Sequence, residues 1–93
     1  MFERVLIQMR DKIRTRQYVV TLHAEEEMDE DELTIFDVES IVLSGSIVER
    51  QKDPVTDEWK HIVKGETLSG SPAIVVTKMS PTGKLVFVTV FRE

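Results

Sequence analysis

The spacing of the apolar residues changes at Gly45, and no other feature of the sequence constrains the fold as strongly. Before Gly45, apolar side chains recur at intervals of three and four positions, which is typical of the buried face of a helix. After Gly45, apolar and polar residues alternate and valine is frequent, which is typical of strands. Helical segments followed by a run of strands predict an α+β fold, with the helices packed against an antiparallel sheet.

Three helices and one short strand are expected before Gly45. A single apolar stripe predicts an amphipathic N-terminal helix within residues 1–16, and it consists of Phe2, Val5, Leu6, Met9 and Ile13. The β-branched and aromatic run at residues 18–22 predicts a short strand. A second helix would bury Ala24 and Met28 and expose the acidic residues around them.

The third helix has the clearest local signals. Thr34 and Asp37 have the spacing of a capping box, in which each side chain binds the backbone N–H of the other residue. The apolar residues that follow form one stripe, namely Ile35, Val38, Ile41 and Val42. Gly45 is expected to end this helix in the left-handed conformation that glycine adopts easily.

Four strands are expected after Gly45, joined by three turns. Residues 53–57 predict a hairpin loop, and the runs Ser-Gly-Ser-Pro at 69–72 and Ser-Pro-Thr-Gly at 80–83 predict two further turns. Short connections of this kind join neighbouring antiparallel strands. The expected architecture is therefore an N-terminal helix, a short strand, two helices and a four-stranded antiparallel meander packed against the helices.

The length of 93 residues indicates a single domain over residues 1–93. Within it, residues 1–16 would form the amphipathic N-terminal helix and residues 18–91 the α+β core. The chain contains no cysteine, which excludes disulfides and thiol chemistry, and no apolar run approaches the length of a membrane span. No export signal is recognised at its start, so a cytoplasmic location is expected.

Charge is distributed unevenly along the chain. Residues 17–45 contain nine acidic residues and no lysine or arginine, whereas residues 1–16 contain five basic and two acidic residues. The acidic segment would repel phosphate groups, so we do not expect it to bind nucleic acid nonspecifically. It suits a solvated helix or a basic protein partner.

Several short motifs together resemble a known family. They are the pair His23-Ala24, Met28 five residues after the histidine, the run Thr-Ile-Phe-Asp-Val-Glu at 34–39, Gly45, residues 47–49 and the closing run at 85–91. Over residues 18–91 the chain resembles the bacterial family known as domain of unknown function 4258 (DUF 4258). That family is similar to the RelE/ParE-type toxins, so the resemblance implies a RelE-like fold and a role in a toxin–antitoxin pair. It also implies a partner, a small zinc-finger antitoxin with Cys-x-x-Cys pairs.

The chain departs from the family pattern at three positions. Many members resemble His-Ala-x-x-Arg-Met-x-x-Arg, whereas Glu27 and Asp31 stand at the two arginine positions here. Members also tend to have a tyrosine where this chain has Phe91. These differences remove two cations and one hydroxyl group from the surface that a ribonuclease would use.

Two histidines are candidates for acid–base catalysis. In a metal-independent endoribonuclease of the RelE type, His23 and His61 could transfer protons at the ribose 2′-hydroxyl, because histidine titrates near neutral pH. The structural alternative for His23 is a hydrogen bond at the start of its helix, beside Glu26 and Glu27. The alternative for His61 is a partly buried side chain on the same strand face as Trp59.

A ribonuclease would also need cations to bind phosphate. Arg50, Lys60 and Lys64 are the candidate substrate-binding residues, and they would form one basic strip if the strand register placed them on the same face. The alternative is an ordinary half-exposed sheet whose lysines maintain solubility. We expect no cofactor or metal ion, because no ligand spacing matches a known site and only His23, Glu26 and Glu27 are suitably close.

Two functions therefore remain open. The first is a toxin-like component of a toxin–antitoxin pair that acts as a metal-independent endoribonuclease on RNA. The second is a non-catalytic interaction module of the same fold, which binds a basic or zinc-finger partner through its acidic helices. In either case the amphipathic first helix could dock onto a second copy of the chain.

Overall fold

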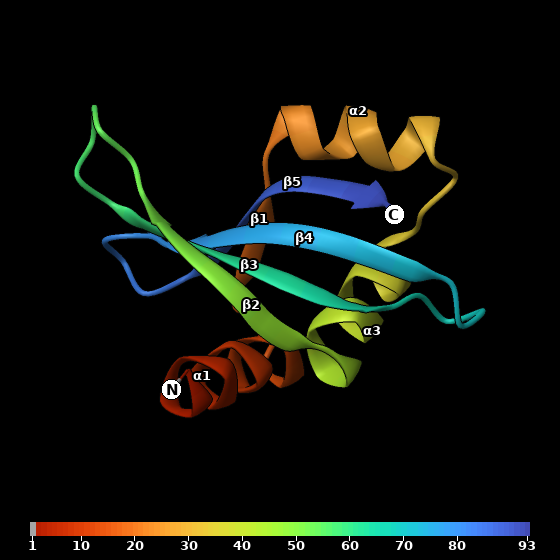
Figure 1. Cartoon of the computed structure of the whole chain (residues 1–93), viewed down its shortest axis with the longest axis horizontal. Helices are drawn as coiled ribbons and strands as arrows, with labels where there is room; N and C mark the ends of the chain where they lie inside the picture. Colours follow the sequence, from red (N-terminus) through yellow and green to blue (C-terminus); the bar gives the residue numbers. More distant parts are fainter. Residues whose placement is uncertain (1) are drawn as a thin grey trace.

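The computed structural model describes residues 2–93, and it confirms the α+β class (Figure 1). Helices and strands follow one another in the expected order. The helices are α1 (Glu3–Arg14), α2 (Leu22–Glu30) and α3 (Ile35–Ser44). The strands are β1 (Tyr18–Val20), β2 (Ser46–Lys52), β3 (Trp59–Glu66), β4 (Pro72–Met79) and β5 (Leu85–Arg92).

The sheet has five strands in the order β1-β5-β4-β3-β2. Strands β2 to β5 are consecutive and antiparallel, which confirms the predicted meander. The short strand β1 adds a fifth member, because it pairs in parallel with β5 and places Tyr18 opposite Leu85. The sheet is therefore mixed, and residues from the start and the end of the chain lie side by side in it.

The first strand ends earlier than the sequence predicts. We expected it to run from residue 18 to residue 22, but β1 ends at Val20 and Leu22 is already helical. The reason is local, since the side chain of Thr21 accepts a hydrogen bond from the backbone N–H of Ala24 and caps α2. The exposed Leu22 follows this cap as the first residue of the helix.

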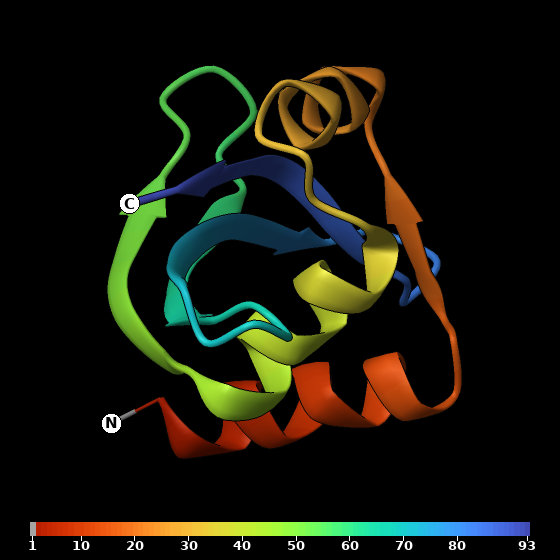
Figure 2. The same cartoon turned by 90° about the vertical axis from the view of Figure 1, so that its right-hand side faces the viewer.

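The helices lie in two different places relative to the sheet. Helices α1 and α3 cover one face, where α3 contacts β3 and β4 and α1 packs on α3 (Figure 1). Helix α2 lies along β5, away from the other two helices (Figure 2). The face of β2, β3 and β4 that is turned away from α3 has no helix packed on it in the part of the chain that the structure describes.

The core lies between the sheet and these helices. As predicted, α1 buries Met9 and Ile13, α2 buries Ala24 and Met28, and α3 buries an apolar stripe centred on Ile41. From the sheet, the largest fully buried side chains are Phe87 and Leu85 of β5, together with Val63, Val75 and Val90. Burial of each such side chain stabilises the fold by roughly 1.5–3 kcal/mol.

The capping box of α3 is confirmed. The backbone N–H of Thr34 donates to the Asp37 carboxylate at 2.9 Å, and the backbone N–H of Asp37 donates to the Thr34 hydroxyl at 3.3 Å. The second carboxylate oxygen of Asp37 accepts the backbone N–H of Leu68 at 3.0 Å. These hydrogen bonds lower the pKa of Asp37. The cap thus fixes the start of α3 and joins it to the β3–β4 turn.

Gly45 ends α3 as expected, but the expected conformation is wrong. Its φ of −97° and ψ of −170° are extended rather than left-handed. Glycine is required here by space, because a Cβ at position 45 would clash with the backbone carbonyl oxygens of Lys64 and Ile41. Gly65, in β3, has the same role, since its Cβ would also clash with the Ile41 carbonyl. The two glycines allow the end of α3 to lie directly on β3.

Substitution of Gly65 by alanine should therefore be more damaging than substitution of a glycine in a turn. We expect Gly65→Ala to lower the free energy of unfolding by about 2–3 kcal/mol, because backbone must move to admit the methyl group. Gly70→Ala is the control, since a Cβ there has open space and only the positive φ of 86° opposes it, at about 1 kcal/mol. Equal losses for the two variants in urea unfolding would contradict close packing at Gly65.

Candidate functional site

Strand β5 has an outer edge that β1 covers only in part. The parallel pairing with β1 ends at Phe87, and beyond it carboxylates of α2 and the following turn accept the edge amides. The backbone N–H of Val90 donates to Glu27 at 3.2 Å, and that of Arg92 donates to Asp31 at 2.8 Å. Without these acceptors the two N–H groups would depend on solvent for a partner.

Thr21 links these two parts of the edge. Its backbone N–H donates to the carbonyl of Phe87, and its hydroxyl donates to the carbonyl of Val88, both at 3.1 Å. Glu27 and Asp31 therefore continue the pairing that β1 begins. The sequence singled out Glu27 and Asp31 as acidic residues where the resemblance implies arginines, and Glu27 also as a neighbour of His23. It did not reveal their β5 partners, which are more than 60 positions away.

His23 adopts the contact expected of a structural histidine. Its Nε2 lies 3.2 Å from the same Glu27 oxygen that accepts the N–H of Val90, and 67% of its side chain is exposed. This arrangement places a titratable group at the surface of the α2–β5 junction. Catalysis by His23 stays a prediction.

The remaining acidic residues of this segment face solvent. Five exposed carboxylates have no hydrogen bond or ion pair with any described residue, namely Glu25, Glu26, Asp29, Glu30 and Glu32. We call these five residues the acidic surface. Four of these residues lie on α2, which buries Ala24 and Met28 on its other side, and Glu32 follows the end of the helix.

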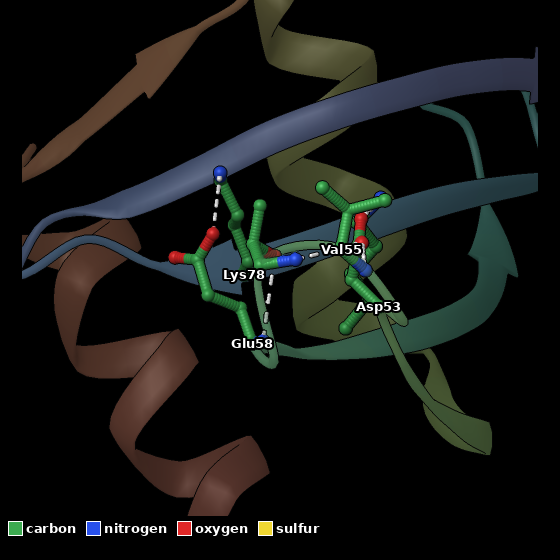
Figure 3. Close-up of polar contacts among 6 residues, drawn as sticks. Asp53, Val55, Glu58 and Lys78 are labelled. Carbon is green, nitrogen blue, oxygen red and sulfur yellow. Dashed lines mark hydrogen bonds and ion pairs between the residues drawn. The ribbon is translucent and has the colours of Figure 1, made fainter.

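The helix-free face of the sheet carries lysines that are already paired. Lys60 lies 3.2 Å from Asp53, and Lys64 lies 2.7 Å from Glu93. Figure 3 shows Lys78 of β4 extending to the carboxylate of Glu58, at 3.4 Å. The sequence singled out the two cations of β3 but not their acidic partners, which are brought near by the hairpin loop and by the end of the chain.

Arg50 does not share a face with Lys60 and Lys64. The register of β2 and β3 places Arg50 opposite His61, and Gln51 opposite Lys60. Residues opposite one another in an antiparallel pair point to the same face, so Arg50 points to the face that carries His61. There its guanidinium lies 4.0 Å from the centre of the Trp59 ring. The three candidate cations therefore form no continuous basic strip, because Arg50 lies on one side of the sheet and the two lysines lie on the other.

His61 lies on the α1 side of the sheet. Its ring contacts Phe2 edge to face, with 6.1 Å between ring centres. Burial and, to a smaller extent, the Arg50 guanidinium lower the pKa of His61, so the neutral imidazole is favoured. His23 stands on α2 at the edge of β5, so the structure does not bring the two candidate catalytic histidines together.

Neither a metal-ligand cluster nor a membrane-spanning helix is found in residues 2–93. No group of three or more histidine or acidic side chains is arranged so that it could hold a metal ion. Likewise, none of the described helices has both the length and the apolar character that a membrane span requires.

Removal of the Glu27 side chain should expose the edge amide of Val90. We expect Glu27→Ala to lower the free energy of unfolding by about 1–2 kcal/mol, because a part-buried donor loses its acceptor. Glu27→Gln keeps an acceptor oxygen and should recover most of the loss. Glu26→Ala, on the exposed side of the helix, should change stability by less than about 0.5 kcal/mol. An effect at residue 26 as large as that at residue 27 would refute this role.

The environment of His61 should make stability depend on pH. Its pKa in the folded chain lies below the ordinary value of 6.5, so the unfolded chain binds the proton more readily. Stability is therefore retained above pH 6.5 and falls as the pH drops from 6.5 toward the folded pKa. A ring titration by NMR should give a midpoint below 6.5, and His61→Phe should reduce the slope of stability against pH in that window. A midpoint at or above 6.5 would contradict the burial of this ring.

One comparison with known proteins identifies the family of the chain. No curated protein and no solved structure matches it. The family model described as domain of unknown function (DUF4258) matches residues 20–92, which leaves α1 outside the match. These residues include the end of β1, the α2–β5 junction, α3 and the whole meander. The chain therefore belongs to the DUF4258 family.

Proposed function

We propose that this chain is a non-catalytic interaction module that binds a cation-rich protein through the acidic surface. The observation that carries the proposal is the difference between the two sets of charges. The described lysines of the helix-free sheet face, Lys60, Lys64 and Lys78, each lie within 3.4 Å of a carboxylate. The five carboxylates of the acidic surface form no ion pair with any described residue.

A surface with unpaired charges of one sign favours association with a partner that carries the opposite charge. A negative surface steers a basic partner during diffusion and raises the association rate, most strongly at low ionic strength. The same surface repels nucleic acid. A protein partner with exposed lysines or arginines therefore fits the acidic surface better than RNA does.

The position of α2 supports this use. Its inner side is fixed by buried Ala24 and Met28 and by the hydrogen bonds from Val90 and Arg92. A rigid helix presents its outer carboxylates in one arrangement, so little conformational entropy is lost when a partner binds. A basic zinc-finger protein of the antitoxin kind is one partner with suitable chemistry.

The proposal predicts that binding depends on where charge lies and not only on net charge. The probe is a synthetic lysine-rich helical peptide, measured by fluorescence anisotropy at several salt concentrations. A variant with Glu25→Gln, Glu26→Gln, Asp29→Asn and Glu30→Gln should bind this peptide about tenfold or more weakly and lose most of the salt dependence.

A second variant with the same change in net charge provides the control. Asp53→Asn, Asp57→Asn, Glu58→Gln and Glu93→Gln remove four carboxylates that are paired with lysines. These changes should weaken peptide binding by less than about threefold. Equal weakening by the two variants would show that only the overall charge matters and would refute the acidic surface as a site.

A toxin-like, RelE-type endoribonuclease is the second candidate. It is supported by Lys60 and Lys64, which share a helix-free face whose ion pairs are weak enough for a phosphate to displace the carboxylates. In this proposal His23 or His61 would transfer protons and Arg50 would bind phosphate, although His61 and Arg50 point to the opposite side of the sheet from the two lysines. The separation of the two histidines and the divided register favour the interaction module over this alternative.

The ribonuclease proposal has its own test, independent of peptide binding. Expression of the chain alone in a bacterial host would be followed for growth and for new ends in messenger RNA. Growth arrest with RNA cleavage that His23→Ala and the double variant Lys60→Ala/Lys64→Ala abolish would make this chain a ribonuclease. Normal growth with intact RNA would reject that function.

A further inference from the structure

A cavity lies between α1 and the end of the sheet where the β2–β3 hairpin begins. Its volume is about 320 Å³. Its lining includes residues of α1, β3, β4 and β5, namely Gln8, Met9, Trp59, His61, Met79 and Leu85. This region is separate from the acidic surface, so an inference about it does not depend on the proposed protein partner.

The lining of this cavity combines an apolar floor with two polar groups. Met9 and Leu85 are fully buried, and Met79 packs against the same core. Two polar residues also line it, the exposed Gln8 at its rim and the partly buried His61, and neither side chain has a hydrogen-bond partner among the described residues. A few polar groups that converge on an apolar cavity are the usual features of a small-molecule site.

The charged residues that line the cavity, Asp57, Glu58 and Lys78, are ion-paired. Glu58 is paired with Lys78 at 3.4 Å, as Figure 3 shows, and Asp57 is paired with Lys52 at 3.0 Å. A charged ligand would have to displace one of these partners. A neutral ligand would leave both pairs in place, so the cavity favours a neutral molecule.

We propose that this cavity binds a small, neutral, planar ring that carries an amide-like edge, with Gln8 and His61 as its hydrogen-bonding partners. The glutamine amide and a neutral imidazole each offer both donor and acceptor groups, which complement a ligand edge that also has both. A cavity of about 150 Å³ accepts benzene, so about 320 Å³ has room for one ring and its polar substituent.

The state of His61 agrees with this chemistry. Its side chain is partly buried, and burial lowers its pKa, so the ring is neutral at physiological pH. A neutral imidazole accepts a hydrogen bond at one nitrogen and donates at the other, whereas the protonated ring only donates. The edge-to-face contact with Phe2 holds the ring at the wall of the cavity.

Trp59 provides a direct readout, because it is the only tryptophan in the chain and lines the cavity. Benzamide is the probe, since it has one ring and an amide edge, and toluene is the matched ring without the amide. Benzamide should change Trp59 fluorescence saturably at about millimolar concentration, as is usual for so small a ligand. Toluene should bind about tenfold more weakly, because it offers neither polar side chain a hydrogen bond.

Substitutions then test whether these two hydrogen-bonding side chains, and not the fold as a whole, determine benzamide binding. Gln8→Leu and His61→Phe should each weaken benzamide binding about fivefold to tenfold, and Gln51→Leu, on exposed β2, should not change it. Amide NMR shifts induced by benzamide in the unmodified chain should centre on α1 and β3. A linear fluorescence response, shifts elsewhere, or equal binding by the Gln8 and Gln51 variants would overturn the proposal.

Discussion

Strand β5 has hydrogen-bonding groups on two edges, and the pairing of its outer edge determines how the first half of the chain is arranged. The inner edge pairs with β4 along its length. The outer edge pairs with β1 up to Phe87, then with Thr21, and then with the carboxylates of Glu27 and Asp31. An exposed sheet edge is a template for aggregation, and here α2 protects it with side chains instead of another strand.

This pairing gives α2 two chemically different sides. The inner side contributes two buried apolar residues and, with the turn that follows, two carboxylates that accept β5 amides. The outer side carries the acidic surface except for Glu32, which follows the helix, and no described cation pairs with these carboxylates. Carboxylates in one short segment therefore have separate environments, and only those on the outer side lack a hydrogen-bond or ion-pair partner in the described chain.

The sheet shows the opposite pattern of charge. Its helix-free face holds three described lysines, and a carboxylate accompanies each of them. Its other face holds Arg50 against Trp59 and leads to the cavity beneath α1. The two faces thus provide different environments, one of balanced charge and one of apolar surface with a few polar groups.

Features that depend on residues close in sequence could be predicted, whereas those that depend on distant strands could not. The capping box of Thr34 and Asp37 follows from spacing over a few positions, but the requirement for glycine at Gly45 comes from β3 and not from its own φ. The side of the sheet to which Arg50 points depends on register with β3, and a β-bulge in β2 alters the alternation. The function of Glu27 depends on a strand edge 63 positions away, and an acidic helix has the same sequence pattern whether its carboxylates face water or such an edge.

Hydrogen exchange of the Val90 backbone amide in the unmodified chain tests the central claim most directly. This N–H lies on the outer edge of β5, beyond the end of β1, and its only acceptor in the described chain is Glu27. If α2 completes the edge, the amide should exchange as slowly as the β5 amides bonded to β4, through opening of the fold. Exchange at the rate of a solvent-exposed amide would show that the edge is open, and would contradict the role of α2 as its cover.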